Sequence, residues 1–114
     1  MALAKKGNLD AAISEFQEAI RINPDYSQAH NNLGVALANI GDLDAAVGEY
    51  QAALTINPNF AQAHYNLGNA LTKKGNLDAA ISEFQKTLTI NPNHSDAYNN
   101  LSLALGQKGR AGTH

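Results

Sequence analysis

The thirteen residues KKGNLDAAISEFQ occur twice in the chain, at positions 5–17 and again at positions 73–85. The two copies lie 68 residues apart, and half of that offset, 34 residues, is a period that runs through the whole sequence. The period is marked by Pro24, Pro58 and Pro92 and by Gly7, Gly41, Gly75 and Gly109. A fixed period of this length predicts a stack of similar supersecondary units.

Each unit has the pattern of two helices. Apolar residues recur every four positions at Ala63, Leu67 and Leu71, which predicts one buried stripe on a helix over about 60–74. Gly75 is expected to end this helix, because glycine adopts a left-handed backbone at little cost. A second helix is expected over about 77–90 and should end before Pro92. The short link predicts an antiparallel hairpin, in which the small residues Gly34 and Gly68 would face Ala46 and Ala80.

The repeat resembles the tetratricopeptide repeat. The resemblance rests on the 34-residue period and on Leu67, Gly68, Leu71, Ala80, Phe84 and Pro92, and it covers essentially the whole chain. It implies an all-α fold in which tandem helix-turn-helix repeats stack as a right-handed α-solenoid. It also implies a scaffold or adaptor that binds an extended peptide or partner segment in a concave groove.

The phase of the repeat divides the single domain of 114 residues into four parts. Residues 1–26 are a partial repeat, with the end of one helix before Gly7 and a second helix over about 9–22. Residues 27–60 and 61–94 are full repeats. Residues 95–114 are expected to form a lone final helix, ending near Lys108, and a flexible tail. Both ends leave apolar faces without a neighbour. The chain is therefore either a piece of a longer array or a module that self-associates head to tail.

The first helix of each repeat should line the groove. Its core positions are already assigned, so the remaining positions on one face are the expected peptide-binding residues: Gln28, Asn31, Asn32, Val35, Asn39, Gln62, Tyr65, Asn66, Asn69, Lys73, Asn99, Asn100 and Leu103. Thr72, Asp96 and Gln107 share that face.

Asn32, Asn66 and Asn100 recur every 34 residues on this face. A carboxamide has two donors and an acceptor, so it can bind both the N–H and the C=O of a peptide backbone. The column is similar to the asparagine ladder of O-linked N-acetylglucosamine transferases, which implies backbone contacts to a client polypeptide. The alternative is that these amides bond to each other or to neighbouring helices.

A second binding mode of the family holds a C-terminal carboxylate between cationic side chains and a central asparagine. Asn66 fits the asparagine of that clamp. Asn31, Asp96 and Asn100 stand where the resemblance implies cations. Because a carboxylate would lose its charge-assisted contacts here, we disfavour this mode.

Composition argues against other classes of function. The net charge of −2 and the pI near 6.0 give no footprint for nucleic acid. We expect no metal, no cofactor, no membrane association and no catalysis. His30 and His64 are one repeat apart, too far to share one ion, and should pack between helices. We expect a solvated outer face on the second helices, formed by Glu15, Glu49 and Glu83. The absence of cysteine is compatible with a cytoplasmic protein.

Overall fold

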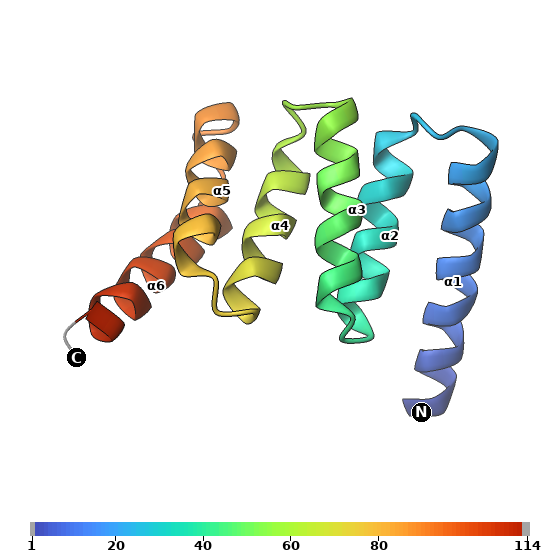
Figure 1. The fold of residues 1–114 in the computed structure, drawn as a ribbon, viewed down its shortest axis with the longest axis horizontal. Helices are drawn as coiled ribbons and strands as arrows, with labels where there is room; N and C mark the ends of the chain where they lie inside the picture. Colours follow the sequence, from blue (N-terminus) through green and yellow to red (C-terminus); the bar gives the residue numbers. More distant parts are fainter. Residues whose placement is uncertain (1, 113–114) are drawn as a thin grey trace. The chain divides into compact units, whose positions relative to one another are not determined.

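The computed structural model describes the backbone of residues 2–112 and the side chains of residues 7–110. Within these residues the chain is all-α, as predicted, and has no strand. It divides into two compact units, Met1–Pro58 and Asn59–His114. Each unit holds three helices (Figure 1).

The first unit contains α1 (Ala2–Ile22), α2 (Ser27–Asn39) and α3 (Leu43–Ile56). Helix α2 packs against both α1 and α3. Small residues make up much of the core of this unit, which lets the helix backbones approach closely. The buried apolar side chains are those of Ala29, Leu33, Ala36, Ala46, Tyr50 and Ala53.

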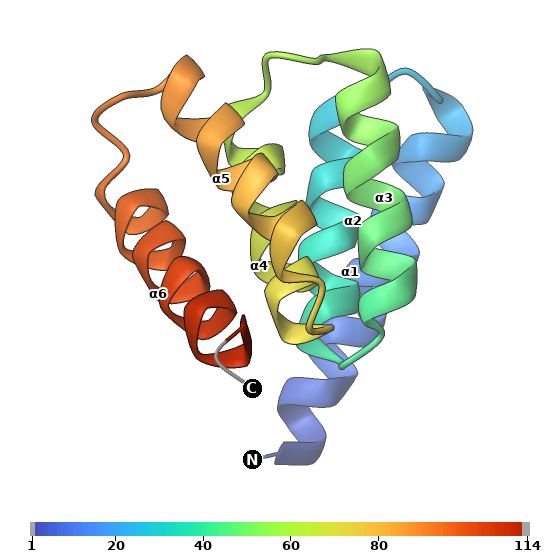
Figure 2. The same ribbon diagram turned by 60° about the vertical axis from the view of Figure 1, so that its left-hand side comes forward.

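The second unit contains α4 (Ala61–Lys73), α5 (Leu77–Ile90) and α6 (Ser95–Gly112), which lie side by side in Figure 2. Helix α5 packs against α4 and α6, and α4 also touches α6. Phe84 is the largest side chain of this core and is 0% exposed. The other buried apolar residues of this unit are Ala63, Leu67, Ala70, Leu71, Ala80, Ile81, Ala97 and Ala104.

The two hairpin turns form where the glycine spacing predicts them. Gly41 and Gly75 have φ values of 89° and 82°, in the left-handed region. The close approach inside each hairpin differs in detail from the expectation. Gly34 and Gly68 face aromatic rings rather than Ala46 and Ala80, because a Cβ at Gly68 would lie 2.6 Å from the ring of Phe84.

Two other glycines do not end a helix as expected. Helix α1 runs without a break through Gly7, and α6 continues through Gly109 to Gly112. At Gly41 and Gly75 the chain reverses direction between two helices that pack on each other, and this packing stabilises the left-handed turn. The described segment before Gly7 continues directly into α1. The expected tail is helical as far as Gly112, and residues 113–114 lie outside the described residues.

Candidate functional site

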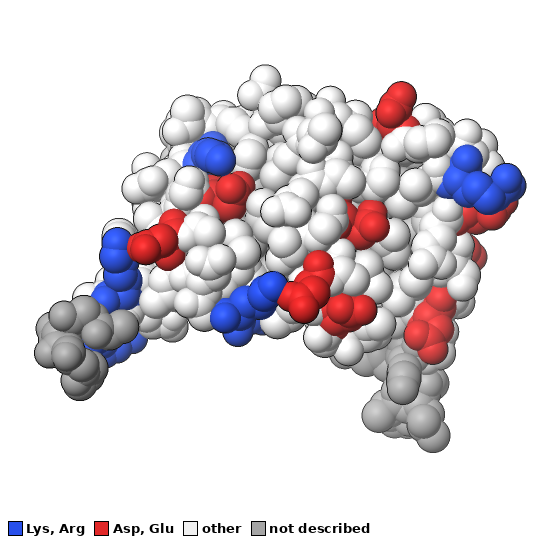
Figure 3. Space-filling model, in the orientation of Figure 1, with Lys and Arg blue, Asp and Glu red and all other residues white. Residues whose placement is uncertain are grey.

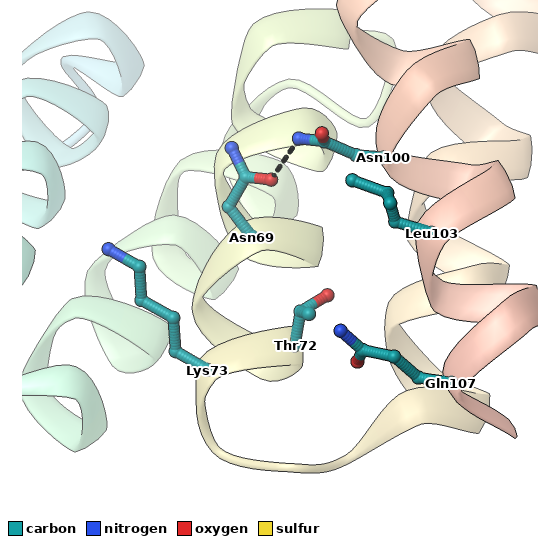
Figure 4. Close-up of a pocket in the computed structure, with 6 residues that line it drawn as sticks. All are labelled: Asn69, Thr72, Lys73, Asn100, Leu103 and Gln107. Atoms are coloured by element: carbon teal, nitrogen blue, oxygen red, sulfur yellow. Dashed lines mark hydrogen bonds between the residues drawn. The ribbon is translucent and has the colours of Figure 1, made fainter. Parts of the chain in front are cut away.

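The second unit has a pocket of about 290 Å³ between α4 and α6, which we call the α4–α6 pocket (Figure 4). Four of its residues are among the predicted peptide-binding residues, and Thr72 and Gln107, which share the groove face, complete the wall. Its lining residues are Asn69, Thr72, Lys73, Asn100, Leu103 and Gln107. Leu103 contributes the apolar part and is 62% exposed. Amide, hydroxyl and apolar groups thus converge on one opening, whereas the Lys73 side chain extends away from α6 (Figure 4).

Asn100 connects α6 to α4. Its Nδ2 donates to Oδ1 of Asn69 at 2.6 Å and to the hydroxyl oxygen of Tyr65 at 3.1 Å. Both protons of the amide are therefore used inside the unit, and its carbonyl oxygen remains as an acceptor. The NH2 group of Asn100 therefore agrees with the alternative that these amides bond to neighbouring helices rather than to a peptide.

Asn32 and Asn66 each accept a hydrogen bond from a glutamine on the same helix. Gln28 Nε2 donates to Oδ1 of Asn32 at 3.0 Å, and Gln62 Nε2 donates to Oδ1 of Asn66 at 3.2 Å. Each pair spans four residues of one helix, which orients the amide on the helix surface. The periodic asparagines are thus held in position, but their contact with a peptide remains a prediction.

Three of the five predicted groove residues of the first unit lie at a second pocket. Asn32, Val35 and Asn39 of α2 line a space of about 220 Å³ together with apolar residues of α1. Asn31 differs from the prediction, because its side chain is only 3% exposed and belongs to the interior. The helical spacing placed it on the edge of the groove face, where a small rotation of the helix decides between surface and core.

Two predicted groove residues of the second unit, Tyr65 and Asn99, do not line the α4–α6 pocket. The ring of Tyr65 packs 6.0 Å from Phe84 and 4.6 Å from His94, measured between ring centroids. Asn99 is exposed but does not line the pocket. His94 is half-buried, and its Nδ1 accepts from the backbone N–H of Ala97 at 3.2 Å.

Histidine–glutamate pairs join the two helices of each hairpin. His30 Nδ1 lies 2.8 Å from Oε1 of Glu49, and His64 Nδ1 lies 2.7 Å from Oε1 of Glu83. His30 Nε2 is also 2.9 Å from the carbonyl oxygen of Pro24. Burial acts to lower the pKa of His30, but Glu49, the Pro24 carbonyl and the charge of Asp25 outweigh it and raise that pKa.

The predicted packing of His30 and His64 between helices is therefore confirmed. The prediction that the glutamates form a solvated outer face is wrong for Glu49 and Glu83. The side chains of Glu49 and Glu83 are 29% and 13% exposed. A signal was present in the sequence, since histidine and glutamate recur 19 residues apart in both full repeats. Sequence reasoning missed it because the two residues lie on different helices.

Charge is spread thinly over the surface. On the face drawn in Figure 3, Lys and Arg alternate with Asp and Glu among many uncharged residues. Among the described residues, no cluster of three or more His, Asp or Glu is arranged to hold a metal ion. In the same part of the chain, no helix is long and apolar enough to cross a membrane.

Comparisons with solved structures find the same fold. The crystal structure of MamA is 26% identical, with 93% of this chain and 62% of that chain covered and a TM-score of 0.86. A mutant of the Thermobaculum terrenum O-GlcNAc transferase is 29% identical over 88% of this chain and 19% of that chain, with a TM-score of 0.82. The chain thus spans less than two thirds of either protein.

A third structure is the first repeat domain of Spaghetti bound to the HSP90 peptide SRMEEVD. It is 21% identical over 92% of this chain and 83% of that chain, with a TM-score of 0.89, and at this identity it shows the fold alone. No curated protein matches the chain. Sequence patterns of the tetratricopeptide repeat match residues 1–59, 61–94 and 83–113. Together with the helical hairpins, these matches show that the chain belongs to the tetratricopeptide repeat family.

Proposed function

We propose that this protein-interaction module binds an extended peptide segment at the α4–α6 pocket. The observation that carries the proposal is the mixture of groups on its wall. The carbonyl oxygen of Asn100 can accept a peptide N–H, and Gln107 can donate to a peptide carbonyl. Leu103 offers an exposed apolar surface beside them. The pocket volume of about 290 Å³ suits one or two peptide side chains, with the backbone running over the opening.

Lys73 adds a preference to this binding. Its side chain is exposed, forms no ion pair with any described residue, and extends away from α6 in Figure 4. An acidic side chain of the peptide can therefore reach it from solvent. The asparagine column supports contacts to the peptide backbone at Asn66 and, through its carbonyl oxygen only, at Asn100.

The peptide complex of Spaghetti supports an interaction role for a chain of this fold, although its peptide cannot be transferred at this identity. A terminal carboxylate clamp is disfavoured, because Asn31, Asp96 and Asn100 are uncharged or acidic where that clamp uses cations. We propose that the partner is a protein segment rather than nucleic acid or membrane, and that the module acts in the cytoplasm.

Panning of a random peptide-display library tests the proposal. The full chain serves as bait, and Leu103→Arg serves as counter-bait because it fills the pocket opening from an exposed position. We expect enrichment of extended sequences that bind the parent and are not retained by Leu103→Arg. Equal retention by both baits would contradict the assignment of the pocket.

Head-to-tail self-association is the second candidate. It is favoured by the exposed apolar side chains of α6, where Tyr98 is 53% and Leu105 is 50% exposed. Sedimentation velocity over a wide range of concentrations separates the two candidates. A monomer at all concentrations supports peptide binding alone. A sedimentation coefficient that rises with concentration and returns to the monomer value in Leu105→Arg would support assembly.

A further inference from the structure

The direction of the Asn100 amide decides what the α4–α6 pocket offers to a peptide. The NH2 group donates to Asn69 and to Tyr65, and the carbonyl oxygen remains for a peptide N–H. Asn69 lines the pocket itself, whereas Tyr65 does not. Any effect of Tyr65 on binding is therefore exerted through Asn100, and it depends on what holds Tyr65 in place.

The imidazole of His94 packs on Tyr65. The centroids of the two rings lie 4.6 Å apart, and the ring planes are inclined at 35°. His94 directly precedes α6, the helix that carries Asn100, whereas Tyr65 belongs to α4. Because the rings are in close contact, each limits the rotation of the other.

His94 also caps the N-terminus of α6. Its Nδ1 accepts from the backbone N–H of Ala97 at 3.2 Å, and its carbonyl oxygen accepts from the N–H of Tyr98 at 3.3 Å. These are the two bonds of an N-cap residue. Tyr26 and Phe60 hold the corresponding positions before α2 and α4, and neither forms a side-chain cap. The side-chain cap is thus a property of His94 and not of the repeat.

The cap of α6 requires a neutral imidazole. Nδ1 accepts a hydrogen bond only while it carries no proton, since both ring nitrogens of an imidazolium are donors. Protonation of His94 therefore removes the bond to Ala97 and places a positive charge where the helix dipole disfavours it. Histidine side chains change charge between about pH 5 and pH 8, and His94 is only half-buried, so solvent protons reach it.

The titratable groups around His94 come from the elements that pack beside it. On α4, Tyr65 is an uncharged phenol, and His64 is bonded to a glutamate of α5. The last turn of α5 and the link after it, residues 87–93, have no titratable side chain. On α6, Asp96 lies in the first turn. Its carboxylate attracts an imidazolium but cannot replace the acceptor that is lost at Nδ1.

We propose that Tyr65 and His94 position Asn100 for peptide binding at the α4–α6 pocket, and that protonation of His94 weakens this binding. Neutral His94 caps α6 and packs on Tyr65, whose hydroxyl oxygen orients the Asn100 amide. When the cap is lost, a smaller fraction of chains holds Asn100 in the binding direction, and the apparent affinity falls in proportion. The inference rests on the peptide binding proposed above and adds its regulation by pH.

The first test measures affinity against pH. A fluorescein-labelled copy of one extended peptide enriched against the parent chain is titrated with the full chain and followed by fluorescence anisotropy. We expect binding to be about threefold or more weaker at about pH 6 than at about pH 8. His94→Asn should bind equally at both pH values, because asparagine is a strong N-cap and does not titrate in this range. His30→Gln is the matched control, since it removes a histidine of the other unit, and it should keep the parent ratio.

The second test separates positioning from general support of the fold. Tyr65→Phe keeps the ring and removes the hydroxyl group, so it should weaken binding at about pH 8 by about threefold. In the Asn100→Ala background the same change should have no further effect, because Tyr65 acts through Asn100. An equal loss in both backgrounds would overturn the positioning role.

The third test needs no peptide. In an NMR titration of the parent chain, the side-chain NH2 signals of Asn100 and the backbone N–H signal of Ala97 should shift with the same midpoint as the His94 ring. In Tyr65→Phe, the Asn100 signals should no longer follow the ring. If no peptide is enriched, the proposed function fails, and this titration still decides whether His94 orients Asn100. Peptide binding with the same affinity at both pH values, or Asn100 signals that do not respond to His94, would overturn this inference alone.

Discussion

Asn100 Nδ2 lies 2.6 Å from Oδ1 of Asn69, on the neighbouring first helix of the same unit. This bond, with the one to Tyr65 at 3.1 Å, connects α6 to α4 directly at the mouth of the α4–α6 pocket. It fixes the direction of the Asn100 amide, so that the carbonyl oxygen is the half left for a ligand. One residue thus serves both the stability of the unit and its proposed binding surface.

Removal of this amide should destabilise the second unit. We expect Asn100→Ala to lower the free energy of unfolding by about 1–2 kcal/mol, because two hydrogen bonds are lost and each contributes about 0.5–1.5 kcal/mol. Asn99→Ala on the same helix is the control, and its exposed side chain predicts a change within about 0.5 kcal/mol. Urea unfolding followed by circular dichroism measures both. Equal stability of the two variants would show that the bonds do not hold α6 to α4.

Gly68 should tolerate no side chain. A Cβ there would lie 2.6 and 2.8 Å from two ring carbons of Phe84, whose ring is fully buried. We expect Gly68→Ala to cost about 1–3 kcal/mol through overpacking.

Gly48 provides the matched control for Gly68, since it lies inside α3 with nothing within 4 Å of its Cβ position. Gly48→Ala should stabilise the chain by up to about 1 kcal/mol, because alanine is the better helix former. Thermal melts of the two variants should move in opposite directions. A Gly68→Ala protein that melts at or above the parent temperature would refute the ring contact.

Stability should depend on pH through His30. The pKa of this imidazole is raised in the folded chain, so the folded state binds the proton more tightly than the unfolded state does. Its contribution is therefore fully present below the unfolded pKa of about 6.5 and is lost as the pH rises through the raised folded pKa. Denaturation midpoints measured from pH 6 upward should fall in the parent and fall less in His30→Gln. An NMR titration of the His30 ring that gives a pKa at or below the ordinary value would contradict this prediction.

The sequence predicted the hairpins because local and long-range signals agree there. Gly75 adopts the left-handed turn and the helix before it packs on the helix after it. The limits of local sequence are visible at Gly7, which lies in the identical stretch KKGNLDAAISEFQ but continues α1 as a helix. The glycine of the same thirteen residues thus lies in a helix in one copy and in a turn in the other, according to what packs against it. A local sequence pattern carries no information about that packing.

The candidate site was predicted in outline but not in its bonding. Helical spacing placed Asn69, Asn100 and Leu103 on one face, and they do line one pocket. Spacing within one helix could not show that Asn100 would use its amide protons on α4, because that depends on the distance between helices. For the same reason helical spacing predicted a surface position for Asn31, which is buried. It also did not predict the bond between His64 and Glu83.

The most direct test of the central claim compares the affinities of two variants for one peptide enriched against the parent chain. Leu103 and Leu105 are both exposed leucines of α6, with 62% and 50% exposure, but only Leu103 lines the α4–α6 pocket. Isothermal titration should show at least a tenfold loss of affinity for Leu103→Arg and an unchanged affinity for Leu105→Arg. Equal affinities, or a loss confined to Leu105→Arg, would contradict peptide binding at this pocket.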